Sequence, residues 1–121
     1  SAVLAWIFDE RGSEVVDRVL DVSGISAVNF AEVLYKCRER GVDAGAMESD
    51  LAAYGLTLLP FGGREARRVV DVTRAEDLAA VRLSLADRCC LASALAWQLP
   101  VVASDNAWEA LGFEVEIVPF R

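Results

Sequence analysis

The chain has 121 residues, the size of one domain, and 55% of them are hydrophobic, which excludes a disordered segment. No apolar run approaches the roughly 20 residues of a membrane span, and no basic segment leads into an apolar one as in a secretory signal. We therefore expect a single cytoplasmic domain over residues 1–121, with no membrane partner. The net charge of −7 argues against a broad electrostatic grip on nucleic acid, but it allows an enzyme whose acids hold a metal ion.

The chain contains three cysteines and no histidine. An odd cysteine count without a secretory signal indicates a reducing compartment, so we expect Cys37, Cys89 and Cys90 to be free, buried side chains. Without histidine, the Ser-His-Asp and Cys-His mechanisms and the common zinc sites are excluded.

The first half of the chain predicts four helices and two short strands. Residues 1–8 are apolar up to a polar turn, and residues 13–20 carry apolar side chains at helical spacing. A brief strand is expected at 22–26, after which Ser26 caps a helix over 28–40 that Gly41 ends. Residues 43–54 predict another helix, and residues 56–60 a second strand.

The second half predicts two longer helices followed by two strands. A helix is expected over 64–83 with a possible break near Thr73, and then an almost wholly apolar, buried helix over 84–99. Residues 100–103 are typical of a buried parallel strand, 106–111 of a turn of helix, and 114–120 of an edge strand. This alternation predicts an α/β fold in which helices cover both faces of a central parallel sheet.

Three acids stand where helices begin or strands end: Glu32, Asp87 and Asp105. Asp105 follows the third strand, Asp87 lies in the first turn of its helix, and Glu32 lies in the second turn, with Asn29 one turn earlier on the same face. In open α/β sheets, ligands bind beyond the carboxyl ends of the strands. We therefore expect these carboxylates to share one cleft, each pair within roughly 8 Å, as ligands of Mg²⁺ or Mn²⁺ in phosphodiester chemistry.

Each acid also has an explanation that needs no ligand. Asp87 can complete a capping box with Ser84. Glu32 can pair with Lys36 one helical turn away, and Asp105 can cap the helical turn that follows it. The acids taken singly leave both kinds of explanation open.

Four segments, taken together and in order, resemble the PIN domain family in its VapC toxin form. They are residues 1–12 (SAVLAWIFDERG), 25–33 (ISAVNFAEV), 83–88 (LSLADR) and 100–108 (PVVASDNAW), which resemble the family's first helix, its two helical acids and its last strand and acid. The resemblance implies a three-layer α/β/α PIN-like fold and a Mg²⁺- or Mn²⁺-dependent endoribonuclease. It also implies a homodimer whose activity a cognate antitoxin protein inhibits.

Carried over position by position, the resemblance makes Glu32, Asp87 and Asp105 the ligands of the metal ion and its water. Asn29 and Ser104 become supporting polar groups, and Arg88 becomes a contact to the RNA substrate.

The chain departs from the family pattern at two places. The pattern begins with a strand that ends in Asp-x-Ser, whose Asp is a principal metal ligand. Ser1 matches that Ser, so we expect the first strand and its Asp to lie upstream of Ser1, and activity to depend on them. The family often has a hydroxyl two residues before its last acid, where this chain has Ala103, with Ser104 next to it.

The sequence therefore predicts a toxin that hydrolyses RNA with the help of a metal ion. One alternative is a catalytically inactive PIN-like domain that binds an antitoxin or regulatory partner. Another is a metal-binding phosphohydrolase that acts on small molecules. The apolar side chains of the first helix, Leu4, Trp6, Ile7 and Phe8, predict a surface that an antitoxin peptide or a second copy covers.

Overall fold

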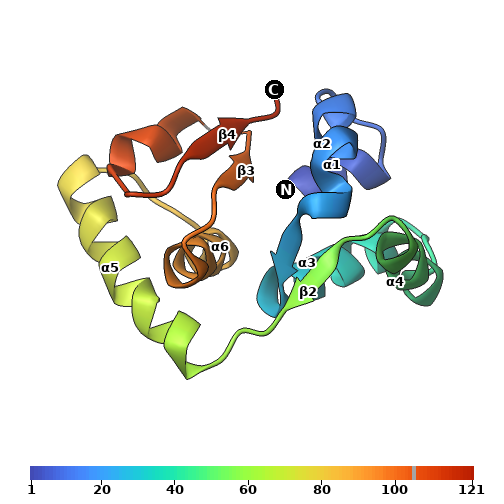
Figure 1. Cartoon of the computed structure of the whole chain (residues 1–121), viewed down its shortest axis with the longest axis horizontal. Coiled ribbons are helices and arrows are strands. Elements are labelled where there is room, and N and C mark those ends of the chain that lie inside the picture. The colour runs from blue at the N-terminus through green and yellow to red at the C-terminus, as the bar shows by residue number, and fades with distance from the viewer. Residues whose placement is uncertain (105) are drawn as a thin grey trace.

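The computed structural model describes residues 1–104 and 106–121 of the chain. Helices and short strands alternate along it, which confirms the α/β class (Figure 1). The first half contains α1 (Ala2–Ile7), α2 (Ser13–Val19), the 3₁₀ turn η1 (Leu20–Val22), β1 (Gly24–Ser26), α3 (Ala27–Glu39), α4 (Ala44–Ala53) and β2 (Thr57–Leu59). The second half contains α5 (Gly63–Ala79), α6 (Leu85–Trp97), β3 (Val101–Ala103), the 3₁₀ turn η2 (Asn106–Leu111) and β4 (Ile117–Pro119).

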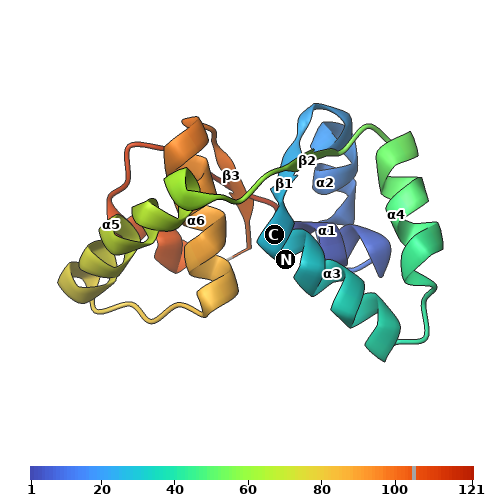
Figure 2. The same cartoon turned by 90° about the horizontal axis from the view of Figure 1, so that it is seen from below.

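The strands form two parallel pairs. β1 pairs with β2, with Ile25 opposite Leu58, and β3 pairs with β4, with Val102 opposite Val118. The two pairs lie in different halves of the molecule, and the N-terminus lies in the middle (Figures 1 and 2). The predicted parallel strands are therefore present. Within the described residues, however, they belong to two separate sheets.

The second half has one continuous hydrophobic core around α6. Residues 91–94 are all buried, because this helix is covered on most sides, as its apolar sequence predicts. Val72 of α5, Val101 of β3 and Trp108 of η2 complete the cluster. α5 packs extensively against α6, so this half supports the start of α6.

The first half divides its core into two smaller clusters. One contains Val33 and Cys37 of α3 with Leu51 of α4, and the other contains Val16 of α2. Phe120, which follows β4, is buried in the second cluster, so the end of the chain also joins the two halves. Between them, α6 packs against α3 and β1 as well as against α5.

The helix over 64–83 differs from its prediction in two ways. α5 runs through Thr73 without a break. The Thr73 hydroxyl donates to the carbonyls of Val69 and Val70 at 2.8 and 3.0 Å, so its hydrogen bonds are made within the helix. The helix also ends early, at Ala79, where Ala80 adopts a left-handed conformation with φ 54°. Leu83 consequently lies in the connection to α6.

The apolar side chains of the first helix are largely used inside the chain. Leu4, Trp6 and Ile7 pack against the first-half clusters, and the Arg40 guanidinium lies 4.1 Å from the centre of the Phe8 ring. The surface that the sequence predicts for a partner is therefore mostly covered by the protein's own residues. Among the described residues, no helix combines the length and the apolar character that a membrane crossing requires.

Candidate metal site at the α3–α6 junction

The start of α3 is fixed by Ser26 at the end of β1. Ser26 has an extended backbone, is buried, and accepts the backbone N–H of Asn29 on its hydroxyl at 3.2 Å. Its hydroxyl also donates to the side-chain oxygen of Asn29. Serine is a preferred N-cap because its short side chain satisfies one of the free N–H groups of the first turn, so the predicted cap is confirmed.

The start of α6 repeats this arrangement. Ser84 caps the helix and accepts the backbone N–H of Asp87 at 3.1 Å. In each helix the third residue donates to the capping serine: Asn29 in α3 and Asp87 in α6. The side chain of that third residue is therefore placed at the open end of the helix.

The two helix starts meet through the Asn29 side chain. Its amide nitrogen donates to the backbone carbonyl of Ala86 at 2.9 Å, across 57 positions of sequence. We call this meeting point the α3–α6 junction. Ala86 precedes Asp87, and Glu32 lies one turn beyond Asn29, so this hydrogen bond brings two of the predicted acids to one junction. Both acids are half-buried.

The charges of both acids affect the pKa of the Cys90 thiol. The pKa of Cys90 is raised to about 12, chiefly by burial, and the negative charges of Asp87, Cys89 and Glu32 contribute to the same rise. Glu32 and Asp87 therefore both act on the sulfur atom of Cys90 in α6. Cys37 and Cys89 are buried and Cys90 half-buried, and burial raises the pKa of Cys37 and Cys89 as well.

The explanations of the acids that need no ligand receive little support. Lys36 lies 4.0 Å from Glu39, so its ion pair is with that residue. Ser84 accepts the N–H of Asp87, but within the described part of the chain no hydrogen bond or ion pair engages the carboxylates of Asp87 and Glu32. Both carboxylates thus remain available to a cation.

The third predicted acid, Asp105, lies outside the described residues. Ser104 directly follows β3 and is exposed. Over residues 1–104 and 106–121, no three His, Cys, Asp or Glu side chains gather in a group that could hold a metal ion. The convergence of all three acids therefore stays a prediction, while Glu32 and Asp87 share the α3–α6 junction.

Comparison with known protein families identifies the family of the chain. The model of the PIN domain matches residues 1–114. The chain belongs to the PIN domain family. No curated protein and no solved structure matches this PIN domain. The family is one of nucleases that typically depend on divalent metal ions, which agrees with a junction built around carboxylates.

The donors of this PIN domain suit a hard cation. Mg²⁺ and Mn²⁺ prefer carboxylate oxygens, and the half-buried Glu32 and Asp87 present such oxygens without a competing lysine or arginine in the described residues. Asn29 holds the two helix starts together with an uncharged side chain, so it adds no positive charge that would repel the ion. The donor chemistry of Glu32 and Asp87 therefore suits magnesium or manganese, and these two acids would be its carboxylate ligands within the described residues.

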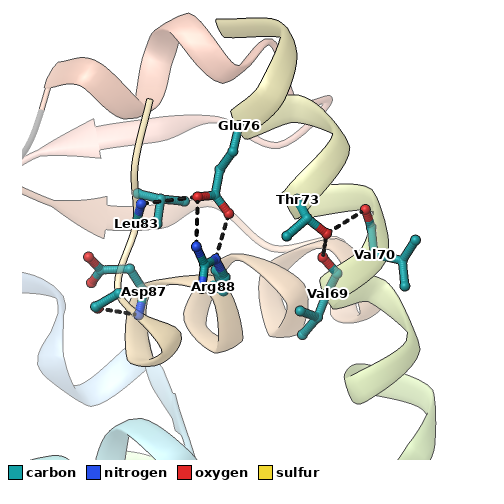
Figure 3. A network of polar contacts seen from close by, with 8 residues as sticks. Val69, Val70, Thr73, Glu76, Leu83, Asp87 and Arg88 are labelled. Atoms are coloured by element: carbon teal, nitrogen blue, oxygen red, sulfur yellow. Dashed lines mark hydrogen bonds and ion pairs between the residues drawn. The ribbon is translucent and has the colours of Figure 1, made fainter. Parts of the chain in front are cut away.

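Arg88, the predicted RNA contact, is engaged by a carboxylate. Its Nε and one Nη lie 2.6 and 3.1 Å from the two oxygens of Glu76 on α5 (Figure 3). The hydrogen bond from Arg88 lowers the pKa of Glu76 more than burial raises it, and the same bond raises the pKa of Arg88. Sequence reasoning missed Glu76, because nothing local distinguishes it from the other acids of the same helix.

Proposed function

We propose that this PIN domain is a Mg²⁺- or Mn²⁺-dependent endoribonuclease that hydrolyses RNA phosphodiesters and acts as the toxin of a toxin–antitoxin pair. One observation carries the proposal: two half-buried carboxylates, unengaged within the described residues, share the α3–α6 junction. A structural acid near a helix start normally accepts hydrogen bonds or an ion pair, and over residues 1–104 and 106–121 no such contact engages these two carboxylates.

The residues take the following roles. Glu32, Asp87 and Asp105 would hold the ion and its water, Asn29 and Ser104 would support them, and an RNA contact at Arg88 would share its guanidinium with Glu76. When bound, the ion lowers the pKa of a water and offsets negative charge on the phosphate. The protein's own part is to hold the carboxylates in place, exclude competing cations and position the RNA backbone.

The proposal includes a further strand with an Asp ahead of Ser1. Within the described residues, β1 pairs with β2 and β3 pairs with β4, each on one side. An additional parallel strand between β1 and β3 would satisfy the backbone groups of both edges. An Asp at its end would bring a further carboxylate towards the junction.

Partners of the toxin form a separate part of the proposal. We expect a cognate antitoxin and a homodimer in the cytoplasm. Support comes from large apolar side chains that stay exposed outside the first helix: Val22 at 82%, Leu78 at 90% and Leu85 at 66%. A contiguous apolar surface, rather than single exposed side chains, would mark the interface, so the partner is to be sought where these side chains adjoin others.

The test is an RNA cleavage assay on the chain with any residues that naturally precede Ser1. We expect cleavage with Mg²⁺ or Mn²⁺, none with EDTA, and loss of most activity in Glu32→Gln. Glu39→Gln is the matched control, because Glu39 is an exposed acid on the same helix whose only ion pair in the described residues is the long one with Lys36. Cleavage that survives both EDTA and Glu32→Gln would show that the carboxylate–metal mechanism is wrong.

A catalytically inactive PIN domain that binds a partner is the second candidate. The observation that favours it is the pair of acids at the junction, where the family's chemistry calls for a larger set of carboxylates. A folded chain that binds a co-expressed antitoxin but neither binds Mn²⁺ nor cleaves RNA would identify this alternative.

A further inference from the structure

Glu76 is a buried acid that holds two parts of the chain at once. Its side chain is 4% exposed. One oxygen accepts from Arg88 Nε at 2.6 Å, and the other accepts from Arg88 Nη2 and from the backbone N–H of Leu83, both at 3.1 Å (Figure 3). Both carboxylate oxygens are therefore used, and all three donors belong to the connection before α6 or to its first turns.

The two groups that Glu76 holds lie on either side of Asp87. Leu83 precedes the capping Ser84, and Arg88 directly follows Asp87. In Figure 3, the Asp87 carboxylate points away from Glu76 and Arg88. Glu76 thus fixes the backbone on both sides of Asp87 without competing for its carboxylate.

The Glu76–Arg88 pair fixes the orientation of the Arg88 guanidinium as well as attracting it. A guanidinium that donates two parallel bonds to a carboxylate is fixed in orientation, whereas a lysine would act as a point charge. Replacing a buried ion pair with apolar side chains is often neutral for stability, so stability alone does not account for one at this place. Its position beside the junction suggests that it sets the orientation of the start of α6.

We propose that Glu76 is a positioning residue of the metal site, which orients Asp87 by holding the Leu83 amide and the Arg88 guanidinium against α5. This inference rests on the proposed function, because it concerns how the carboxylates of the same site are held. It adds a residue outside the junction, on a helix that carries none of the predicted ligands.

The test compares Glu76→Gln with Glu65→Gln. Glu65 is the matched control: it lies on the same helix, is 5% exposed, accepts the Gly62 N–H at 3.3 Å and lies 3.8 Å from Arg64, near the opposite end of α5. Glutamine at position 76 would place an amide donor against the guanidinium, so one of the two parallel bonds is lost.

Three readouts separate positioning from plain destabilisation. In Glu76→Gln we expect faster hydrogen exchange at the Leu83 and Asp87 amides, a Mn²⁺ dissociation constant raised by roughly tenfold in calorimetry with the metal alone, and a matching rise in the Mn²⁺ concentration needed for RNA cleavage. Glu65→Gln should keep the wild-type Mn²⁺ affinity, even where it lowers the melting temperature as much.

Each outcome decides between the two proposals. A wild-type chain that neither binds Mn²⁺ nor cleaves RNA overturns the proposed function, and the role of Glu76 falls with it. A wild-type chain that binds Mn²⁺, beside a Glu76→Gln variant with unchanged affinity and unchanged exchange at Asp87, overturns the positioning role alone. If Glu76→Gln fails to fold, Arg88→Lys keeps the charge but loses the two parallel bonds, and it should weaken Mn²⁺ binding in the same direction.

Discussion

Both α3 and α6 begin with a serine whose hydroxyl accepts the backbone N–H of the third residue of the helix. Beyond this shared cap the two starts differ. α3 follows a buried strand and joins α6 through a neutral amide, Asn29. α6 follows a loop and is held to α5 by a carboxylate–guanidinium pair, Glu76 and Arg88. The comparison teaches that a local cap sets where a helix begins, whereas a second contact from elsewhere in the chain sets which way its start points.

The third residue of each helix has a correspondingly different use. Within the described residues, the side chain of Asn29 makes two hydrogen bonds, one with the capping Ser26 and one with Ala86 of α6. The side chain of Asp87 makes none within the described residues. One helix start therefore provides the link of the junction, and the other provides a free carboxylate.

The largest expected effect is on RNA cleavage and comes from removing the charge of the Asp87 carboxylate. Asp87→Asn should lower metal-dependent cleavage by more than roughly a hundredfold, since losing even an outer partner of a metal ligand costs about 10–100-fold. Folding without metal should stay within about 1 kcal/mol of wild type, because the first-turn charge that is lost is offset by less repulsion from Glu32. Cleavage kinetics and urea unfolding measure the two quantities. A large loss of stability would assign Asp87 to capping instead.

Removing the Asn29 side chain should reduce activity less than Asp87→Asn does, but it should affect both helix starts. Asn29→Ala leaves the half-buried carbonyl of Ala86 without its donor, so we expect a loss of roughly 1–3 kcal/mol in unfolding free energy. Mn²⁺ affinity should fall with it, because the two helix starts are no longer joined. Chemical denaturation and calorimetry measure both. A stable variant with unchanged affinity would contradict the role of Asn29 in the junction.

The two caps should differ in strength. Ser84→Ala should cost about 1 kcal/mol, the usual value for an N-cap. Ser26→Ala should cost about 1 kcal/mol more, because the buried Ser26 hydroxyl also donates to Asn29. Urea unfolding of the two variants side by side measures this difference. Equal losses would mean that the second hydrogen bond of Ser26 contributes nothing.

The smallest expected effect is a difference in acid sensitivity. The pKa of Glu76 is lowered in the folded chain below the unfolded value of about 4.3. The Glu76–Arg88 pair therefore stabilises the fold fully above that unfolded value, and this contribution is lost as the pH falls through the lower folded pKa. The gap in stability between wild type and Glu76→Gln should narrow in acid, whereas the gap for Asn29→Ala should stay constant, because no titrating group takes part in that link. Unfolding curves between neutral and acidic pH measure both gaps.

Much of the fold could be predicted from the sequence, because its signals are local. Ser26 and Ser84 mark helix starts through bonds that span three residues, and Gly41 ends α3 with a left-handed conformation at φ 73°. The apolar run of α6 indicates a buried helix wherever that helix lies. The acids at helix starts could likewise be identified as candidates, because a helix start is a property of its own few residues.

Tertiary structure decided which of these local features meet. The contact of Asn29 with Ala86 and the pair of Glu76 with Arg88 depend on how helices pack, and helix periodicity alone does not specify crossing angles. The same reason applies to the first helix, whose apolar residues signal burial but do not specify which surface packs against them. It also explains why α5 continues through Thr73: the hydroxyl can bond to carbonyls of its own helix, and the packing of α5 along α6 stabilises that choice. Sequence thus determined which residues can act, and packing between distant segments determined which of them act together.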